Sequence, residues 1–277
     1  MALWEANGKT FLITGGASGM GARYLKTFLE QGAKKIAILD VAVDQGKALA
    51  EQYDKSYPGK VIFIKCDMSK EEDIDKAFQE VVGTFQQVDV IINNAGIMVD
   101  APGIWRTAAD VNYQGLVALT LKGITHMDKS EGGAGGTIVN IASTVALTRV
   151  PFLPIYSGAK SAVMHFCRCL AMDPFYANTG VRILCMCFGP TDTPLLKNLD
   201  KRVYDPKLGK EFATATPENG VYYQKVESAI SSVEHMMTHG SCGSVWLSVH
   251  DKPANDITAL VNQAYGLLEK EIYRFAP

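Results

Sequence analysis

Short apolar runs rich in β-branched residues alternate along the chain with longer segments whose apolar residues recur at helical spacing. The apolar runs predict about seven strands, near residues 10–14, 36–40, 60–66, 88–93, 136–143, 181–188 and 244–249. The intervening segments predict helices near residues 19–31, 43–55, 104–129, 154–177 and 217–237, with a further helix capped by Ser69. Strands that alternate with helices form right-handed βαβ units, so the pattern predicts one parallel sheet covered on both faces.

Nothing in the pattern divides the chain, because it contains no internal repeat and no linker, and the Gly-rich residues 131–136 are typical of a turn. We therefore expect one doubly wound α/β domain over residues 1–277. The irregular residues 191–225 predict a lid over the substrate. The helical pattern within residues 253–277 predicts a tail that covers either the site or a partner subunit.

The charge balance excludes some partners. Lys plus Arg is 27 and Asp plus Glu is 29, which gives a net charge of −2 and no basic surface for nucleic acid or anionic membranes. No apolar run reaches the roughly 18–20 residues that span a bilayer. The first residues lack the basic and apolar regions of a signal peptide. We expect a cytoplasmic protein without a membrane span.

The six cysteines predict reduced thiols. Cys167 and Cys169, and likewise Cys185 and Cys187, form C-x-C pairs in apolar stretches, where buried thiols are more typical than disulfides or a metal site. The histidines show one i, i+4 pair, at residues 235 and 239, which lacks the adjacent Glu of a zinc motif. We expect no metal.

A glycine-rich turn follows the first strand, with the sequence TGGASGMG at residues 14–21. Glycines in such a turn allow close approach of the backbone to a pyrophosphate, and the next helix directs its N-terminal N–H groups at that anion. Position after a strand and before a helix favours this interpretation over an ordinary turn. The residues predicted to bind a dinucleotide here are Gly15, Ser18, Gly19, Met20 and Gly21.

Asp40 ends the second predicted strand, 25 residues after Gly15. A carboxylate at this place accepts hydrogen bonds from the adenosine ribose and repels a 2′-phosphate, so it predicts NAD rather than NADP. Alternatively, Asp40 caps the following helix. Asp67 and Met68 follow the third strand and are expected beside the adenine, although a capping role for Asp67 is equally consistent with the sequence.

Further motifs fall in the same order as in a known family: N-N-A-G at residues 93–96, Ser143, and Y-x-x-x-K at residues 156–160. Together with the glycine-rich turn, they resemble the short-chain dehydrogenase/reductase family over about residues 8–195. Residues 111–117, 132–136 and 155–163 are similar to insect-type alcohol dehydrogenases and 15-hydroxyprostaglandin dehydrogenases. The resemblance implies a Rossmann fold, NAD-dependent oxidoreduction between an alcohol and a ketone, and a homodimer or homotetramer.

The resemblance also assigns residues to roles. It implies that Ser143, Tyr156 and Lys160 are catalytic and that Asn112, through its side chain or main chain, holds a water linking Lys160 to solvent. It places a further set beside the cofactor: Asn94, Ala95, Gly96, Tyr156, Lys160, Gly189, Thr191 and Thr193.

One segment departs from the family. The chain has Phe188-Gly189-Pro190 where Pro-Gly is usual, and Thr191 where Ile or Val is usual. The departure leaves open which backbone groups hold the carboxamide of a nicotinamide.

Tyr156 and Lys160 are spaced i, i+4, so their side chains share one face of the predicted helix. A free tyrosine has a pKa of about 10, too high for a base at neutral pH. The Lys160 ammonium and a cationic nicotinamide ring would lower the pKa of Tyr156 toward the working pH. Tyr156 is then the general base and Ser143 binds the substrate hydroxyl. No G-x-S-x-G motif makes Ser143 a hydrolase nucleophile.

Apolar residues follow the predicted strand ends and are expected to form the substrate wall: Met98, Val145, Leu147, Phe152, Leu153, Leu195 and Leu196. Arg149 is the one cation placed to meet a substrate carboxylate. The pattern predicts an apolar aliphatic, terpenoid or steroid-like alcohol, although these residues could instead pack the core. A carbonyl reductase working in the reductive direction and a catalytically idle NAD-binding regulatory module remain alternatives.

Overall fold

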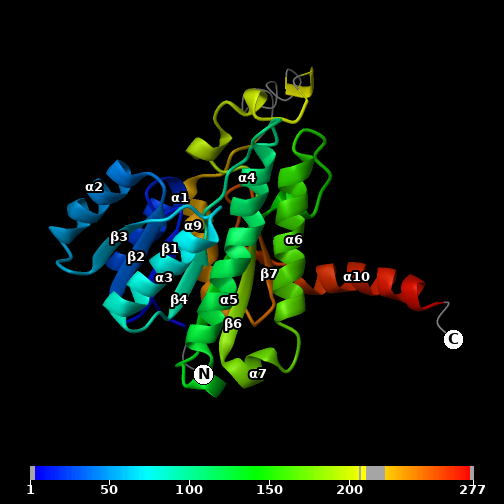
Figure 1. Cartoon of the computed structure of the whole chain (residues 1–277). Helices are drawn as coiled ribbons and strands as arrows, with labels where there is room; N and C mark the ends of the chain where they lie inside the picture. The colour runs from blue at the N-terminus through cyan, green and yellow to red at the C-terminus, as the bar shows by residue number, and fades with distance from the viewer. Residues whose placement is uncertain (1–3, 206, 210–221, 275–277) are drawn as a thin grey trace.

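The protein is described here by a computed structural model, which covers residues 4–205, 207–209 and 222–274. The strands in these ranges form a single sheet of eight, in the order β3-β2-β1-β4-β5-β6-β7-β8 (Figure 1). Strands β1 to β7 are parallel, as the sequence predicts. The two-residue β8 (Asn255–Asp256), which the sequence did not predict, pairs antiparallel with β7.

Residues on the two sides of each strand pack into two separate apolar clusters. The parallel strands are β1 (Thr10–Thr14), β2 (Lys35–Asp40), β3 (Val61–Lys65), β4 (Val90–Asn93), β5 (Gly136–Ser143), β6 (Val181–Phe188) and β7 (Val245–Ser248). In β1, Leu12 lies in one cluster, and Phe11 and Ile13 lie in the other. Successive strand residues point to opposite faces, and both faces are covered, which explains the nearly continuous apolar runs.

Helices cover both faces of the sheet (Figure 1). One cluster includes residues of α1 (Gly19–Glu30), α2 (Val43–Asp54) and α9 (Val226–His239). The other includes residues of α3 (Glu71–Phe85), α5 (Leu116–Met127), α6 (Pro154–Leu170) and α10 (Thr258–Tyr273). Short 3₁₀ turns span Lys129–Glu131, Thr144–Ala146, Pro194–Leu196 and Leu199–Lys201.

Two predicted helices are interrupted in the structure. The helix expected over residues 104–129 begins with α4 (Trp105–Ala109), passes through a π-helical segment (Asp110–Gly115) and continues as α5. The helix expected over residues 154–177 stops at Leu170, and the short α7 (Phe175–Thr179) follows Pro174, whose ring removes an N–H donor.

Ser69 does not cap α3, contrary to the sequence prediction. The helix begins at Glu71 after Lys70, which makes no side-chain capping bond, while the acidic first turn is present as expected. The Ser69 amide and hydroxyl instead donate to the Asp67 carboxylate, at 3.0 and 2.7 Å. The start of the helix predicted at residues 217–237 falls partly on residues 217–221, which lie outside the described residues.

The structure also tests the predictions about the cysteines, the C-terminal residues and a membrane span. Cys169 is exposed, unlike Cys66, Cys167, Cys185 and Cys187, so only part of the buried-thiol prediction is confirmed. The last helix, α10, projects from the body (Figure 1) and exposes Leu267, Leu268 and Ile272. Across the described residues, no helix is both long and apolar enough to cross a membrane.

Gly21 allows α1 to pack directly on the glycine-rich turn. A Cβ at this position would lie 2.0 Å from the Gly15 carbonyl oxygen. Because backbone cannot move aside cheaply, we expect Gly21→Ala to lower the free energy of unfolding by roughly 1–3 kcal/mol in urea titrations. Gly83→Ala on the exposed side of α3, where no atom lies within 4 Å of the added Cβ, is the control. We expect this control to raise stability by about 0.5–1 kcal/mol, and equal effects in both variants would contradict the packing argument.

Candidate active site

A cavity of about 890 Å³ opens at the carboxyl ends of the strands, around the point where the strand order reverses between β1 and β4. Ligands of doubly wound sheets bind at this kind of crevice. The predicted site residues that line the cavity are Gly15, Ser18, Gly19, Met20, Asp40, Asp67, Met68, Asn94, Ala95, Gly96, Met98, Ser143, Val145, Leu153, Tyr156, Lys160, Gly189, Thr191, Thr193, Leu195 and Leu196. Those that do not line it are Gly21, Asn112, Leu147 and Phe152.

The glycine-rich turn lines part of the cavity. Gly15 and Gly19 have φ of 63° and 52°, a conformation that glycine adopts without strain. A Cβ on Gly15 would lie 3.0 Å from the Ala95 Cα. Ser18 makes no side-chain capping bond, and the first turn of α1 has no acidic residue. The first turn of α1 is therefore not capped by its own side chains, and the shape of the turn fits a dinucleotide pyrophosphate.

Asp40 performs the capping that sequence reasoning left as an alternative, and it also borders the cavity. One carboxylate oxygen accepts the Ala42 amide, at the start of α2, and the other accepts the Ala17 amide in the glycine-rich turn, both at 3.0 Å. The carboxylate thus braces the turn and presents its negative charge to the same cavity.

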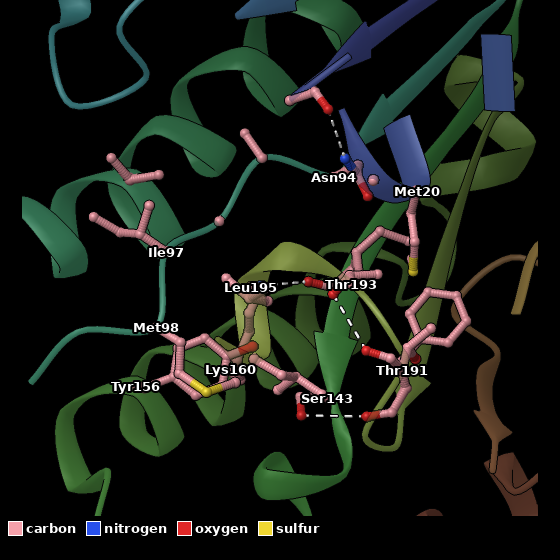
Figure 2. A pocket seen from close by; sticks show the side chains of 18 of the residues that line it. Met20, Asn94, Ile97, Met98, Ser143, Tyr156, Lys160, Thr191, Thr193 and Leu195 are labelled. Atoms are coloured by element: carbon pink, nitrogen blue, oxygen red, sulfur yellow. Dashed lines mark hydrogen bonds between the residues drawn. The ribbon is translucent and has the colours of Figure 1, made fainter. Parts of the chain in front are cut away.

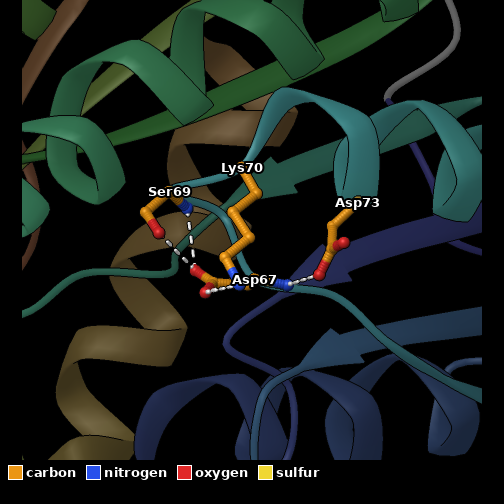
Figure 3. Close-up of polar contacts among 4 residues, drawn as sticks. All are labelled: Asp67, Ser69, Lys70 and Asp73. Atoms are coloured by element: carbon orange, nitrogen blue, oxygen red, sulfur yellow. Dashed lines mark hydrogen bonds and ion pairs between the residues drawn. The ribbon is translucent and has the colours of Figure 1, made fainter.

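Asp67 is held by its own loop (Figure 3). Besides the two bonds from Ser69, its carboxylate lies 3.8 Å from the Lys70 ammonium, and its amide donates to Asp73 at 3.2 Å. Burial raises the pKa of Asp67, but the hydrogen bonds from Ser69 and the Lys70 charge outweigh it, so the pKa lies below the usual value. The carboxylate is ionised at neutral pH while the residue lines the cavity.

Thr14 joins the ends of β1 and β4, a role that sequence reasoning did not assign. Its hydroxyl oxygen accepts the amides of Asn94 and Ala95, at 3.0 and 2.9 Å. The Asn94 side chain donates back to the carbonyls of Thr14 and Gly15, at 3.0 and 3.3 Å. These bonds hold the N-N-A-G segment against the glycine-rich turn.

Ser143, Tyr156 and Lys160 meet at the base of the cavity (Figure 2), and none is more than 8% exposed. Ser143 ends β5, where its hydroxyl donates to the Phe188 carbonyl and accepts the Val145 amide, both at 3.3 Å. The Lys160 ammonium donates to the Ile141 carbonyl at 2.8 Å and lies 5.7 Å from the centre of the Tyr156 ring. The i, i+4 spacing on α6 thus places both side chains on one face, as predicted.

Burial controls the acid–base properties of this pair. It raises the pKa of Tyr156, which the Ser143 hydrogen bond lowers and the Asp100 charge raises further. The net direction is upward, because desolvation of a phenolate outweighs its neighbours in the chain, whereas the lowering expected from the sequence also includes the charge of a nicotinamide ring. Burial also lowers the pKa of Lys160 to about 8, with Cys185 and Cys187 acting in the opposite direction. Lys160 therefore remains largely protonated at neutral pH.

Asn112 lies in the π-helical segment rather than in a regular helix. Its side-chain oxygen accepts the Ile97 amide at 3.0 Å, and its side-chain nitrogen donates to the Ile97 carbonyl at 2.7 Å. A Cβ built on Gly96 would lie 3.0 Å from the Asn112 oxygen and 3.7 Å from the Lys160 nitrogen, so this glycine leaves room between them. The Asn112 side chain thus holds the loop that lines the cavity.

The unusual loop after β6 is fixed by Gln224, which sequence reasoning missed. The fully buried Gln224 side chain donates to the Thr191 hydroxyl at 3.0 Å and to the Ser248 carbonyl at 3.1 Å. The Gln224 backbone adds two more bonds. Its backbone N–H donates to the Pro190 carbonyl at 2.8 Å, and its backbone carbonyl accepts the Asp192 N–H at 3.0 Å. A threonine at position 191 is therefore matched by a buried amide partner. No local signal marks Gln224, because its partners lie far from it in sequence.

The wall opposite the glycine-rich turn is mostly apolar. Leu153, Leu199 and Met98 pack in one cluster with the Tyr156 ring, and Figure 2 shows Met98 beside that ring. Leu199 and Val150 line the cavity although the sequence did not indicate them, because Leu199 begins a short 3₁₀ turn and Val150 lies in an irregular loop, and neither segment has a periodic pattern.

Other predicted features of the wall are corrected. Leu147, which is 40% exposed, and Arg149, which is also exposed, do not line the cavity. Phe152 does not line the cavity either, but packs against the apolar cluster that contains Leu153. The charged side chains among the described lining residues are Asp40, Asp67 and Lys160. No described residue of α10 lines the cavity. Within the predicted lid, residues 206 and 210–221 lie outside the described residues.

Comparison with known proteins agrees with this geometry. The sequence profile of the family described as short chain dehydrogenase matches residues 9–203. The chain belongs to the short-chain dehydrogenase family. It is 35% identical over 210 residues to 15-hydroxyprostaglandin dehydrogenase [NAD(+)] of Bos taurus, covering 74% of this chain and 76% of that protein. It is 31% identical over 256 residues to alcohol dehydrogenase 2 of Ceratitis capitata, covering 89% and 98%.

Solved structures support the same fold for this short-chain dehydrogenase. The crystal structure of levodione reductase superposes with a TM-score of 0.72 at 23% identity, covering 87% of this chain and 96% of that chain. A short-chain type dehydrogenase/reductase from Mycobacterium marinum superposes with a TM-score of 0.73 at 22% identity, covering 89% and 96%. The prediction of a Rossmann-type fold is confirmed.

The buried Lys160 ammonium should make the free energy of unfolding depend on pH. Its pKa is about 8 in the fold against 10.5 as the ordinary value, so the unfolded chain binds more protons between these pH values. The free energy of unfolding of the wild type, relative to Lys160→Met, should therefore rise from about pH 8 to pH 10.5. Urea titrations of both proteins across this range measure the difference, and a difference independent of pH would contradict the lowered pKa.

Proposed function

We propose that this short-chain dehydrogenase is an NAD-dependent alcohol dehydrogenase or ketone reductase for an apolar substrate, with Tyr156 as the general base. The observation that carries the proposal is the convergence of Ser143, Tyr156 and Lys160 on one cavity that also contains the glycine-rich turn. A reacting hydroxyl between the Ser143 and Tyr156 side chains would lie beside a cofactor held by that turn. An idle NAD-binding module would not need this buried arrangement.

The residues that would hold NAD lie along the length of the cavity. The glycine-rich turn would receive the pyrophosphate, Asp40 the ribose hydroxyls, and Lys160 with residues 189–193 the nicotinamide side. When bound, NAD supplies the hydride acceptor for oxidation, and its reduced form supplies the hydride for reduction. NAD rather than NADP is favoured because the described lining residues near Asp40 include no Arg or Lys to receive a 2′-phosphate.

Proton handling is the work of the chain itself. In oxidation, Tyr156 takes the hydroxyl proton of the alcohol while Ser143 holds the oxygen by a hydrogen bond. Burial makes the Tyr156 phenolate costly, so its formation depends on the Lys160 ammonium and on the positive charge of NAD⁺. With the Asn112 side chain engaged by Ile97, the Asn112 main chain is the better candidate to hold a relay water.

The substrate class follows from the wall. Met98, Val150, Leu153 and Leu199 offer apolar surface, and the cavity contains no cation besides Lys160 among its described lining residues. A substrate carboxylate would find no partner there, and burying it unpaired would be costly. An uncharged aliphatic, terpenoid or steroid-like alcohol therefore fits better than an anionic one.

The first test is a panel of secondary alcohols and ketones, with turnover measured by the change in NADH absorbance. We expect turnover of apolar alcohols with NAD, and kcat/KM with NADP lower by roughly tenfold or more, because Asp40 repels a 2′-phosphate. Anionic hydroxy acids of the same carbon skeleton are the matched comparison and should react more slowly. NADH binding without any turnover across the panel would support the idle module instead.

The second test is Tyr156→Phe. Removal of the phenol oxygen should lower kcat by at least about 100-fold while NADH binding, measured by fluorescence, stays within the range of the wild type. Tyr113→Phe is the control, because Tyr113 packs edge-on against Phe166 and does not line the cavity. Substantial turnover by Tyr156→Phe would rule out the proposed base.

A further inference from the structure

Asp100 is a buried carboxylate at the end of the irregular segment 94–100, which connects β4 to the turn before α4, and only 1% of the residue is exposed. Its two oxygens reach the start of α6, more than 50 residues away in sequence. One accepts the Ile155 amide at 2.6 Å, and the other accepts the Tyr156 amide at 3.0 Å. Asp100 thus binds the backbone of the proposed base itself.

These two amides are the donors that α6 cannot satisfy alone. The first N–H groups of a helix have no partner within it. Pro154 has no N–H, the Ser157 amide already donates to the Leu153 carbonyl at 2.9 Å, and Leu153 at the N-cap offers no side-chain acceptor. Asp100 completes the cap from a distant segment, and its negative charge lies at the positive end of a 17-residue helix.

The segment that carries Asp100 is fixed along its length. Asn94 is bonded to Thr14 at one end, and Ile97 is held by the Asn112 side chain in the middle. At the other end, the Asp100 amide donates to the Arg202 carbonyl at 2.6 Å. Asp100 therefore connects α6 to a loop that is itself tied to the glycine-rich turn and to the wall around Leu199.

We propose that Asp100 is a positioning residue for the reaction: its carboxylate holds the first turn of α6 so that the Tyr156 hydroxyl stays in register with Ser143 and the cofactor cradle. The proposal rests on the proposed function of Tyr156. Displacement of a reacting group by about 1 Å can lower a rate by about 100-fold, so a small shift of this turn matters.

The Asp100 charge provides a second readout. It raises the pKa of Tyr156, so removing the charge should move the acidic limb of the kcat–pH profile to lower pH. Among the described residues, the titratable side chain in contact with the Tyr156 ring is Lys160, which Asp100 substitutions leave in place. The Arg202 contact with Asp100 is through its backbone carbonyl, while its guanidinium donates to Leu195 at 3.5 Å.

The experiment compares Asp100→Asn and Asp100→Ala with the wild type in the full chain. Asparagine keeps one acceptor oxygen without the charge, whereas alanine keeps none. We expect kcat to fall by about 10- to 100-fold in Asp100→Asn and further in Asp100→Ala, with NADH dissociation constants within about twofold of the wild type. Hydrogen exchange of the Ile155 and Tyr156 amides should be faster, and the acidic limb of the kcat–pH profile should move down.

Asp128→Asn is the matched control, because Asp128 caps a 3₁₀ turn by accepting the Ser130 amide at 2.8 Å and does not line the cavity. Its kcat should equal that of the wild type. Wild-type kcat and an unmoved pH profile in a folded Asp100→Asn would overturn the proposal, as would a kcat loss matched by an equal loss of NADH binding. Should Asp100→Ala not fold, Asp100→Asn decides. Failure of the proposed function is distinguishable, because Tyr156→Phe would then keep its turnover.

Discussion

The hydrogen bonds between Thr14 and the Asn94-Ala95 backbone are the constraint on which the rest of the site depends. They join the ends of β1 and β4, where the strand order reverses and the sheet opens a crevice. The glycine-rich turn leaves one side of this joint, and the segment toward Asp100 leaves the other. The glycine-rich turn and the start of α6 are therefore parts of one hydrogen-bonded framework, which the proposed alignment of a cofactor and a substrate would require.

Burial disfavours the charged forms of both Tyr156 and Lys160. The fold removes Tyr156 and Lys160 from water, which favours a neutral phenol and weakens the hold of the ammonium on its proton. The same low-polarity surroundings strengthen any interaction between charges that do form there. Under the proposed function, the Lys160 ammonium alone does not offset the burial of Tyr156, so proton removal would depend on the added positive charge of an oxidised cofactor.

The loop after β6 shows how a departure from a family pattern is accommodated. Thr191 places a hydroxyl in a buried position, where an unpaired polar group would be costly. Gln224 satisfies it and, through Ser248, ties the loop to the end of β7. The loop after β6 is consequently held by side chains as well as by backbone where it borders the cavity, and Thr191 and Gln224 are best understood as a pair.

Local sequence alone determined the seven parallel strands, the glycine-rich turn and the shared face of Tyr156 and Lys160, because each depends on periodicity or spacing over a few residues. It did not reveal the π-helical segment around Asn112, the end of α6 at Leu170, or the exposure of Leu147, which depend on packing and on local breaks that a long apolar pattern hides. Tertiary structure alone decided the hydrogen-bond partners of Thr14, Asp100 and Gln224, which are distant from them in sequence. It also decided how strongly burial raises the pKa of Tyr156, because desolvation is set by everything packed around a side chain and not by its neighbour one helical turn away.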